Sequence, residues 1–178
     1  TLLRAAAALA PSSRECASHS RRLARVHADR NQFDKAAEFM HWAERLSPEW
    51  FRPYLDEARI HFDNGNPGAA EEALRRGTAA IPQSLALHLG IARLYLDELP
   101  GRLQNPARAE PAARAAATLS ANANPAALEY LARALHQQGK LAEAMEAVEG
   151  ALKVERNPAR QALRDDIFNR MVREPSNP

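Results

Sequence analysis

The sequence has few of the residue types that form cross-links and catalytic sites. Cys16 is the only cysteine among the 178 residues, so an internal disulfide and a cysteine-based zinc cluster are excluded. Glycine-rich phosphate loops, the His-Glu spacing of metalloproteases and the Gly-x-Ser-x-Gly elbow of hydrolases do not occur in it. We therefore expect a protein that is not an enzyme and that has no catalytic residue and no cofactor.

Long apolar runs and an excess of one charge are lacking too. The longest apolar stretch, residues 2–10, is interrupted by Arg4 and is far shorter than the roughly 20 residues that span a membrane. Lys and Arg number 24 against 22 Asp and Glu, so no basic field favours nucleic acid. We expect no nucleic-acid partner and no direct membrane insertion.

Aromatic residues make up only 6% of the chain, too little for one large core, whereas alanine is frequent and suits the small-residue interfaces of stacked repeats. A short pattern of alanine followed by arginine returns four times. The copies are Ala24-Arg25, Ala58-Arg59, Ala92-Arg93 and Ala132-Arg133. They recur after 34, 34 and 40 residues, and self-similarity at such a period is typical of stacked-repeat proteins.

Proline, glycine and asparagine divide the chain into helical hairpins. Asn64-Gly65 and Gln138-Gly139 predict turns, while Asn66-Pro67 and Asn124-Pro125 predict helix starts. Residues 99–105 lengthen the turn of the third hairpin. We expect one array over residues 1–173, followed by a disordered tail over 174–178. Its parts are a half-repeat helix (1–13), four repeats (about 17–50, 51–84, 85–124 and 125–158) and a capping helix (158–172).

Helices of about 14 residues with a period of 34 resemble the tetratricopeptide repeat. The residues that carry the resemblance are Leu23, Ala24, Phe33, Ala36, Met40, Ala43 and Pro48 in the first repeat, Tyr54, Ala58, Gly65, Ala70, Leu74 and Pro82 in the second, Ile91, Ala92 and Tyr95 in the third, and Leu128, Leu131, Ala132, Leu135, Gly139, Leu141, Ala144, Val148 and Ala151 in the fourth. The resemblance implies an all-α fold, a right-handed α-solenoid of antiparallel helix hairpins. Glu57 departs from the pattern because an apolar residue is expected there.

The resemblance also implies a concave groove lined by the first helix of each repeat, in which a protein or peptide partner binds. The candidate groove residues are Arg21, Arg25, Asp29, Arg59, Phe62, Asp63, Arg93, Leu96, Asp97 and Arg133. Arginine offers a fork of donors to carboxylates or backbone carbonyls of a partner. The lysine and asparagine with which some family members clamp a chaperone tail are replaced by Arg21 and Arg25, so we do not expect that ligand.

Two further hypotheses remain open for the Arg and Asp rows. The rows can serve stacking between repeats, with the chain acting as a structural scaffold of a membrane-associated or secretory machine. Alternatively, the chain is an accessory module for an anionic polymer or for a catalytic domain attached outside it. Frequent Ala and Arg indicate a bacterial source, in the cytoplasm or periplasm, and a first residue other than Met leads us to expect a tethering region upstream.

His27 and His61 occupy equivalent places in successive repeats and have Asp29 and Asp63 nearby. A metal needs several ligands that converge, whereas equivalent residues are held a repeat apart. We therefore interpret the two histidines as polar substitutes for an aromatic spacer and predict no metal site. Trp42 and Phe39 are expected to be packing residues rather than anchors for a partner.

Overall fold

The computed structural model describes residues 13–173, which contain helices and no strand. The expected all-α fold of antiparallel helix hairpins is confirmed over this range. The predictions for residues 1–12 and 174–178 lie outside the described residues. The chain divides into two compact units, with the boundary in the sequence between Pro82 and Gln83, and each is described by itself. A single array over residues 1–173 stays a prediction.

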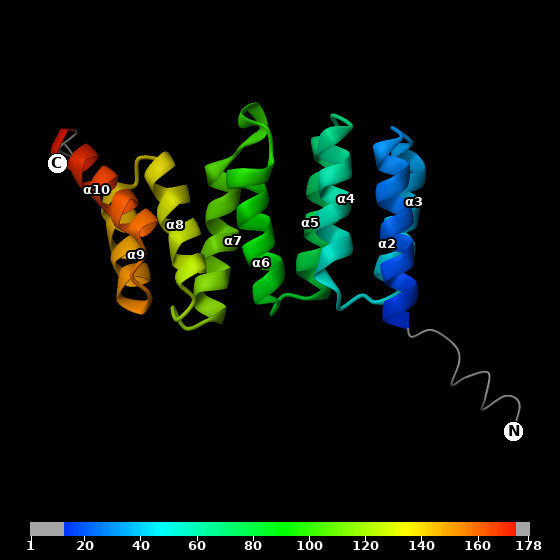
Figure 1. Cartoon of the computed structure of the whole chain (residues 1–178), viewed down its shortest axis with the longest axis horizontal. Coiled ribbons are helices and arrows are strands. Elements are labelled where there is room, and N and C mark those ends of the chain that lie inside the picture. The colour runs from blue at the N-terminus through cyan, green and yellow to red at the C-terminus, as the bar shows by residue number, and fades with distance from the viewer. Residues whose placement is uncertain (1–12, 174–178) are drawn as a thin grey trace, which may run out of the picture. The chain divides into compact units, whose positions relative to one another are not determined.

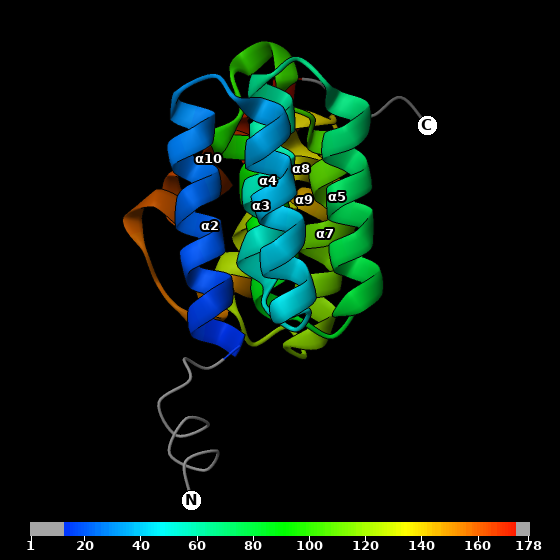
Figure 2. The same ribbon diagram turned by 90° about the vertical axis from the view of Figure 1, so that its right-hand side faces the viewer.

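The first unit holds two helical hairpins. They are α2 (Ser13–Asp29) with α3 (Phe33–Leu46), and α4 (Phe51–Asp63) with α5 (Pro67–Ala80). The two helices of each hairpin lie side by side, and α3 packs against α4, so the hairpins are joined through that pair (Figures 1 and 2). The first repeat was expected to begin near residue 17, and α2 begins four residues earlier, at Ser13.

The second unit holds two hairpins and a further helix. Its first hairpin is α6 (Leu85–Arg93), continued by the π-helical turn η1 (Leu94–Glu98), with α7 (Pro106–Leu119). The second is α8 (Pro125–Gln137) with α9 (Leu141–Val154), and α10 (Pro158–Arg173) packs against α9 (Figure 1). The helix over residues 158–172 therefore covers α9, as expected of a capping helix, with Ile167 fully buried.

Buried alanines hold the repeats together, as the period predicts. Ala24, Ala58, Ala92 and Ala132 of the first helices are all 0% exposed. Their counterparts in the second helices are fully buried too, and these are Ala36, Ala70, Ala109 and Ala144. A methyl group at each of these places lets two helix backbones approach closely, so a larger side chain there would force the helices apart.

The helix starts and turns follow from local chemistry. The side chains of Asn66, Asn105 and Asn124 accept hydrogen bonds from backbone N–H groups three residues later, and each precedes a proline that opens a helix. The hairpin turns need one residue with positive φ, which is Gly65 (+70°) in the second repeat and Gly139 (+77°) in the fourth. Glycine adopts this conformation without strain, so both turns are encoded locally.

The insertion in the third repeat begins with a widened helical turn. In η1 the Leu99 N–H donates to the carbonyl of Leu94 five residues earlier, at 3.1 Å. A 3₁₀ turn, η2 (Gly101–Leu103), follows, and the Asn105 N–H donates back to the carbonyl of Tyr95 at 3.1 Å. These bonds close the longer loop, so the next helix still starts beside η1.

One local expectation was wrong. Trp42 does not pack in the core, because it lies on the outer side of α3 with 48% of its surface exposed, under the guanidinium of Arg45 at 4.2 Å. Pro111 lies inside a helix, as the sixth residue of α7. The N–H that proline lacks at this place would have donated to the carbonyl of Ala107.

No helix among the described residues is long and apolar enough to cross a membrane.

Candidate protein-interaction surface

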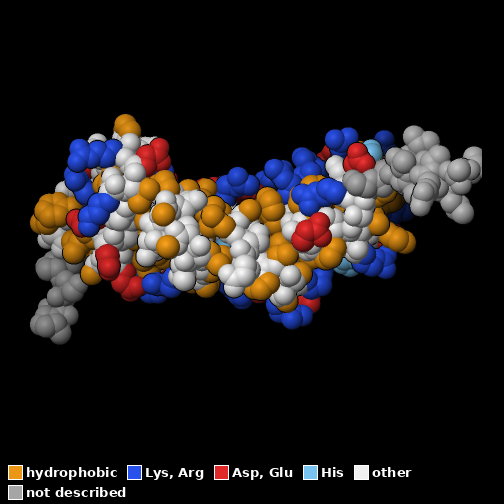
Figure 3. All heavy atoms as spheres, turned by 90° about the horizontal axis from the view of Figure 1, so that it is seen from below, with side chains coloured by type: hydrophobic (Ala, Val, Ile, Leu, Met, Phe, Trp, Pro, Cys, Tyr) orange, Lys and Arg blue, Asp and Glu red, His pale blue; other side chains and the backbone are white. Residues whose placement is uncertain are grey.

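The first helices of the first unit expose a row of charged side chains. Arg25 and Asp29 of α2 and Arg59 and Asp63 of α4 are all exposed, as expected of residues that meet a partner. Phe62 is 6% exposed, so it supports this surface from below instead of presenting its ring. Figure 3 shows acidic and basic side chains interspersed with apolar ones over the face that it presents.

Arg21 joins the two hairpins of the first unit. Its Nε lies 2.5 Å from Oδ2 of Asp56, so α2 and α4 are linked across neighbouring repeats. Both side chains are about three quarters or more buried, which shields the pair from water and salt. Arg21 therefore already has a partner within the fold.

The corresponding row of the second unit is also paired. Both terminal nitrogens of Arg133 in α8 donate to the carboxylate of Asp97, and one of these bonds measures 3.2 Å. Arg93 pairs with Glu98, five residues later, at 2.7 Å. In the wide turn of η1, a residue lies beside the one five places later, so Glu98 pairs with Arg93. Asp97 then faces α8 and pairs with Arg133. Leu96 is 3% exposed and packs inward.

An aromatic ring lies beside this pair. The guanidinium of Arg133 is 5.7 Å from the ring centre of Tyr130, which adds a weak cation–π contact. Partial burial, and then the nearby Asp97, raise the pKa of the Tyr130 hydroxyl, so it stays protonated and remains a hydrogen-bond donor. The first-helix face of the second unit therefore carries the paired guanidinium of Arg133 beside the ring and the hydroxyl donor of Tyr130.

The first unit contains a buried polar group that we call the Glu57 cluster, formed by His41, Glu44, Glu57, His61 and Arg76. Glu57 of α4 is 1% exposed. Nη2 of Arg76 in α5 lies 2.6 Å from its Oε2, and Nε2 of His41 in α3 lies 2.9 Å from its Oε1. Glu44 of α3 accepts from Arg76 at 3.3 and 3.4 Å. Three helices from two repeats thus meet at one buried carboxylate.

Burial dominates the electrostatics of the Glu57 cluster. Burial first, and then the neighbouring Glu57, raise the pKa of Glu44 to about 8 against the opposing effect of Arg76. Burial also lowers the pKa of His61, with help from His41 and Arg76. The two carboxyl groups therefore share one guanidinium, which balances only one negative charge.

The second unit has a charge network of another kind, near its surface. Glu110 of α7 accepts from Lys140 at 2.6 Å, from Arg114 at 2.9 Å and from Gln138 at 2.9 Å. Arg114 also binds Glu143 of α9 at 3.0 Å. Hydrogen bonding by Lys140 first, and then by Arg114 and Gln138, lowers the pKa of Glu110 to about 2. This network ties α7 to the hairpin of α8 and α9.

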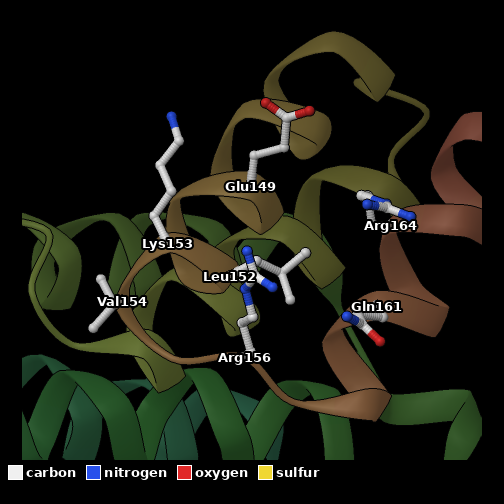
Figure 4. A pocket seen from close by; sticks show the side chains of 7 residues that line it. All are labelled: Glu149, Leu152, Lys153, Val154, Arg156, Gln161 and Arg164. Atoms are coloured by element: carbon white, nitrogen blue, oxygen red, sulfur yellow. The ribbon is translucent and has the colours of Figure 1, made fainter.

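A hollow of about 630 Å³ lies where α9 ends and α10 begins. Lys153, Arg156 and Arg164 line it together with a single acid, Glu149 (Figure 4). Arg164 is bound to Asp165, and no ion pair of Lys153 or Arg156 is found within residues 13–173. Most of its charged lining residues are therefore basic.

The sequence pointed to the exposed charges but not to the partners that they find. His27 behaves as the spacer that was expected, since its ring stacks on Phe39 at 5.2 Å. The Glu57 cluster was missed because its members come from three helices. The one signal for it was Glu57 itself, a charged residue at an apolar place in the repeat.

Comparison with known proteins agrees with this architecture. A sequence profile of the tetratricopeptide repeat matches residues 55–103 and 99–161, more than half of the chain. No curated protein matches the sequence. Among solved structures, PilF of Pseudomonas aeruginosa superposes with a TM-score of 0.63 at 17% identity, over 92% of this chain and 72% of PilF.

Two further structures share the fold. MamA from AMB-1 gives a TM-score of 0.59 at 18% identity, over 89% of this chain and 84% of that one. TTC0263, a tetratricopeptide repeat protein of Thermus thermophilus, gives 0.54 at 16% identity, over 88% and 84%. Identities this low are informative about fold alone. The repeat profile, the buried alanines and the paired helices together show that the chain belongs to the tetratricopeptide repeat family.

Proposed function

We propose that this chain is a non-enzymatic interaction module that binds an extended, acidic segment of a partner protein along the first helices of a unit. Tetratricopeptide repeats are in general protein-interaction modules, which supports the broad class. The observation that carries the finer proposal is the exposure of Arg25 and Arg59 at equivalent places in successive repeats.

The physical argument starts from what these arginines contribute to folding. An exposed ion pair contributes only about 0–1 kcal/mol, so stability is a weak reason for repeating the same cation at the same place. A guanidinium instead gains most when a partner carboxylate accepts both of its parallel N–H groups. An extended segment advances about 3.3 Å per residue, so a few residues reach from one first helix to the next.

The test uses peptides in place of the unidentified partner. Fluorescence anisotropy would compare the affinity of labelled, extended 12-residue peptides that are rich in aspartate, rich in lysine or neutral. We expect the acidic peptide to bind best and the double variant Arg25→Glu, Arg59→Glu to lose about tenfold or more of its affinity. Unchanged affinity in that variant, with an unchanged melting temperature, would refute the proposal.

Matched controls separate a local effect from a change in net charge. Lys35→Glu in α3 and Arg102→Glu in η2 reverse exposed cations outside the first helices. Together they change the net charge by as much as the double variant does. If they weaken binding equally, the attraction is general electrostatics and no particular surface is involved.

A second candidate function is favoured by two ion pairs that members of the rows form within the fold. Arg133 with Asp97, and Arg21 with Asp56, each join neighbouring repeats, as the stacking hypothesis requires. In this role the chain is a scaffold within a larger assembly. The charge swap Arg133→Asp, Asp97→Arg tests it. If each single change lowers the stability and the swap restores it, the result supports stacking. If the peptide affinity follows this pattern instead, the result supports binding.

A further inference from the structure

The Glu57 cluster has an arrangement that structural packing alone does not require. His41 and Glu44 stand one turn apart on α3, and Glu57 and His61 stand one turn apart on the facing helix α4. Side chains three or four residues apart project from the same face of a helix. Each of the two facing helices therefore directs one imidazole and one carboxyl group into the space between α3 and α4.

The distances suit a small cation. One ligand atom from each of His41, Glu44 and Glu57 can be chosen so that all three lie within 4.8 Å of one another. Zinc–ligand bonds are about 2.0–2.2 Å long, so the ligands of a zinc ion lie about 3 to 4 Å apart. Small rotations of these side chains cover the difference, and Nε2 of His41 already lies 2.9 Å from Oε1 of Glu57.

The charges leave room for a cation as well. Arg76 approaches from α5 and binds Oε2 of Glu57, which leaves Oε1 facing the two imidazoles. Arg76 is shared by two carboxyl groups, so a bound cation would complete the charge balance when both are ionised. Arg76 would then orient the carboxylates from behind, as hydrogen-bonded partners of metal ligands commonly do.

Access is provided by His41, whose side chain is 52% exposed while Glu57 is buried. We propose that His41, Glu44 and Glu57 form a site for one divalent transition-metal ion of the zinc class, which links the first two repeats. Imidazole nitrogen together with carboxylate oxygen favours zinc over magnesium or calcium, which prefer oxygen alone. Three protein ligands leave a position for water on the exposed side.

In the experiment, the metal-free chain is titrated with zinc chloride. Calorimetry measures the affinity and the number of ions bound, and thermal melting measures the change in stability. Every variant carries Cys16→Ser, because a thiolate would otherwise bind zinc elsewhere. We expect one ion per chain and a raised melting temperature, with no response to the same concentration of magnesium. A chain that zinc leaves unchanged, or that responds equally to magnesium, would overturn the proposal.

Variants locate the ion. His41→Ala changes an exposed residue and is expected to fold and to weaken zinc binding by about tenfold or more. Glu57→Gln should weaken it as well, and Glu44→Gln replaces that variant if the buried change prevents folding. His19→Ala removes an exposed histidine of α2 and should bind as tightly as the parent. Full zinc affinity in His41→Ala would show that the ion binds elsewhere and would refute the site.

Discussion

The two units solve the same packing problem with different chemistry. In the first unit, the repeat interface carries Glu44, Glu57 and Arg76, which bind one another. By the period of the repeat, the equivalent residues of the second unit are Ala117, Leu131 and Gly150. They line a hollow of about 530 Å³, together with Leu128 and Leu135 and with charged side chains such as Arg114, Glu143 and Lys153. The same helix arrangement thus accepts either a charged group that fills the space or small apolar residues that leave it open.

The charged interface of the first unit depends on all of its members. Each buried charge of the first unit is tolerable only while the others remain, because removal of one leaves the rest without compensation. The apolar residues at the equivalent places of the second unit have no such dependence, since each side chain contributes its own buried area. We therefore expect single changes to be more damaging in the first unit than in the second.

The largest effect is expected for Arg76→Ala. Loss of the guanidinium leaves Glu44 and Glu57 buried together without a cation, which should lower the free energy of unfolding by about 3–5 kcal/mol. Urea denaturation followed by circular dichroism measures it. The control Arg75→Ala removes the neighbouring exposed arginine, which pairs with Glu72 on the surface, and should change stability by less than about 1 kcal/mol. Equal losses in both variants would contradict the comparison.

Replacement of the whole group should have the opposite sign. The triple variant Glu44→Leu, Glu57→Leu, Arg76→Met converts the first interface to apolar chemistry of similar volume. Buried ion pairs exchanged in this way leave proteins as stable as before or more stable by about 1–4 kcal/mol. The same urea measurement decides. A triple variant that is less stable than Arg76→Ala would show that the charged group is itself a net source of stability.

The charge network of the second unit should respond to acid. The pKa of Glu110 in the folded chain lies near 2, below the ordinary 4.5, so its stabilisation is present above about pH 4.5 and is lost as the pH falls toward 2. Because its partners Arg114 and Lys140 are partly exposed, we expect no more than about 1 kcal/mol. Glu110→Gln should therefore be less stable than the parent at pH 7 and equal to it at pH 2.

Thermal melts across this pH range provide the measurement. Glu146→Gln, an exposed change in α9, is the matched control and should follow the parent at every pH. If Glu110→Gln keeps the full acid dependence of the parent, other carboxylates cause it.

The smallest effect is expected for Gly150→Ala in α9. An added Cβ would lie 3.5 Å from Cδ1 of Leu128, an ordinary contact, and alanine favours a helix over glycine by about 0.5–1 kcal/mol. A rise of that size in unfolding free energy is the predicted outcome. Gly139→Ala should act in the opposite direction, because its φ of +77° strains any other residue. A destabilised Gly150→Ala would show that the hollow has no room for a methyl group.

Much of the fold could be predicted because its signals are local. Asn124 followed by Pro125 predicts where α8 begins, and Gly139 predicts where its hairpin turns. Neither prediction needs distant residues. Trp42 was misplaced for a related reason. Its aromatic side chain suggested burial, but its place on α3 faces outward, and side-chain type alone does not report the face.

The candidate site was predicted less completely. The exposed positions of Arg25 and Arg59 follow from the repeat, since they lie about 100° from the buried alanines. The pairing of Arg133 with Asp97 depends on the π turn of η1, which changes which carboxylate faces which helix. No pattern in the sequence states that turn.

By itself, the sequence determined the class of the fold, the helix starts, the turns and the small residues between helices. These depend on contacts within a few residues or on a period that repeats along the chain. The tertiary structure decided which charges meet. Glu57 finds Arg76 nineteen residues away and His41 sixteen residues before it, and only the packing of α3, α4 and α5 places them at one point. Electrostatic pairing depends on distance in space, which a linear pattern does not contain.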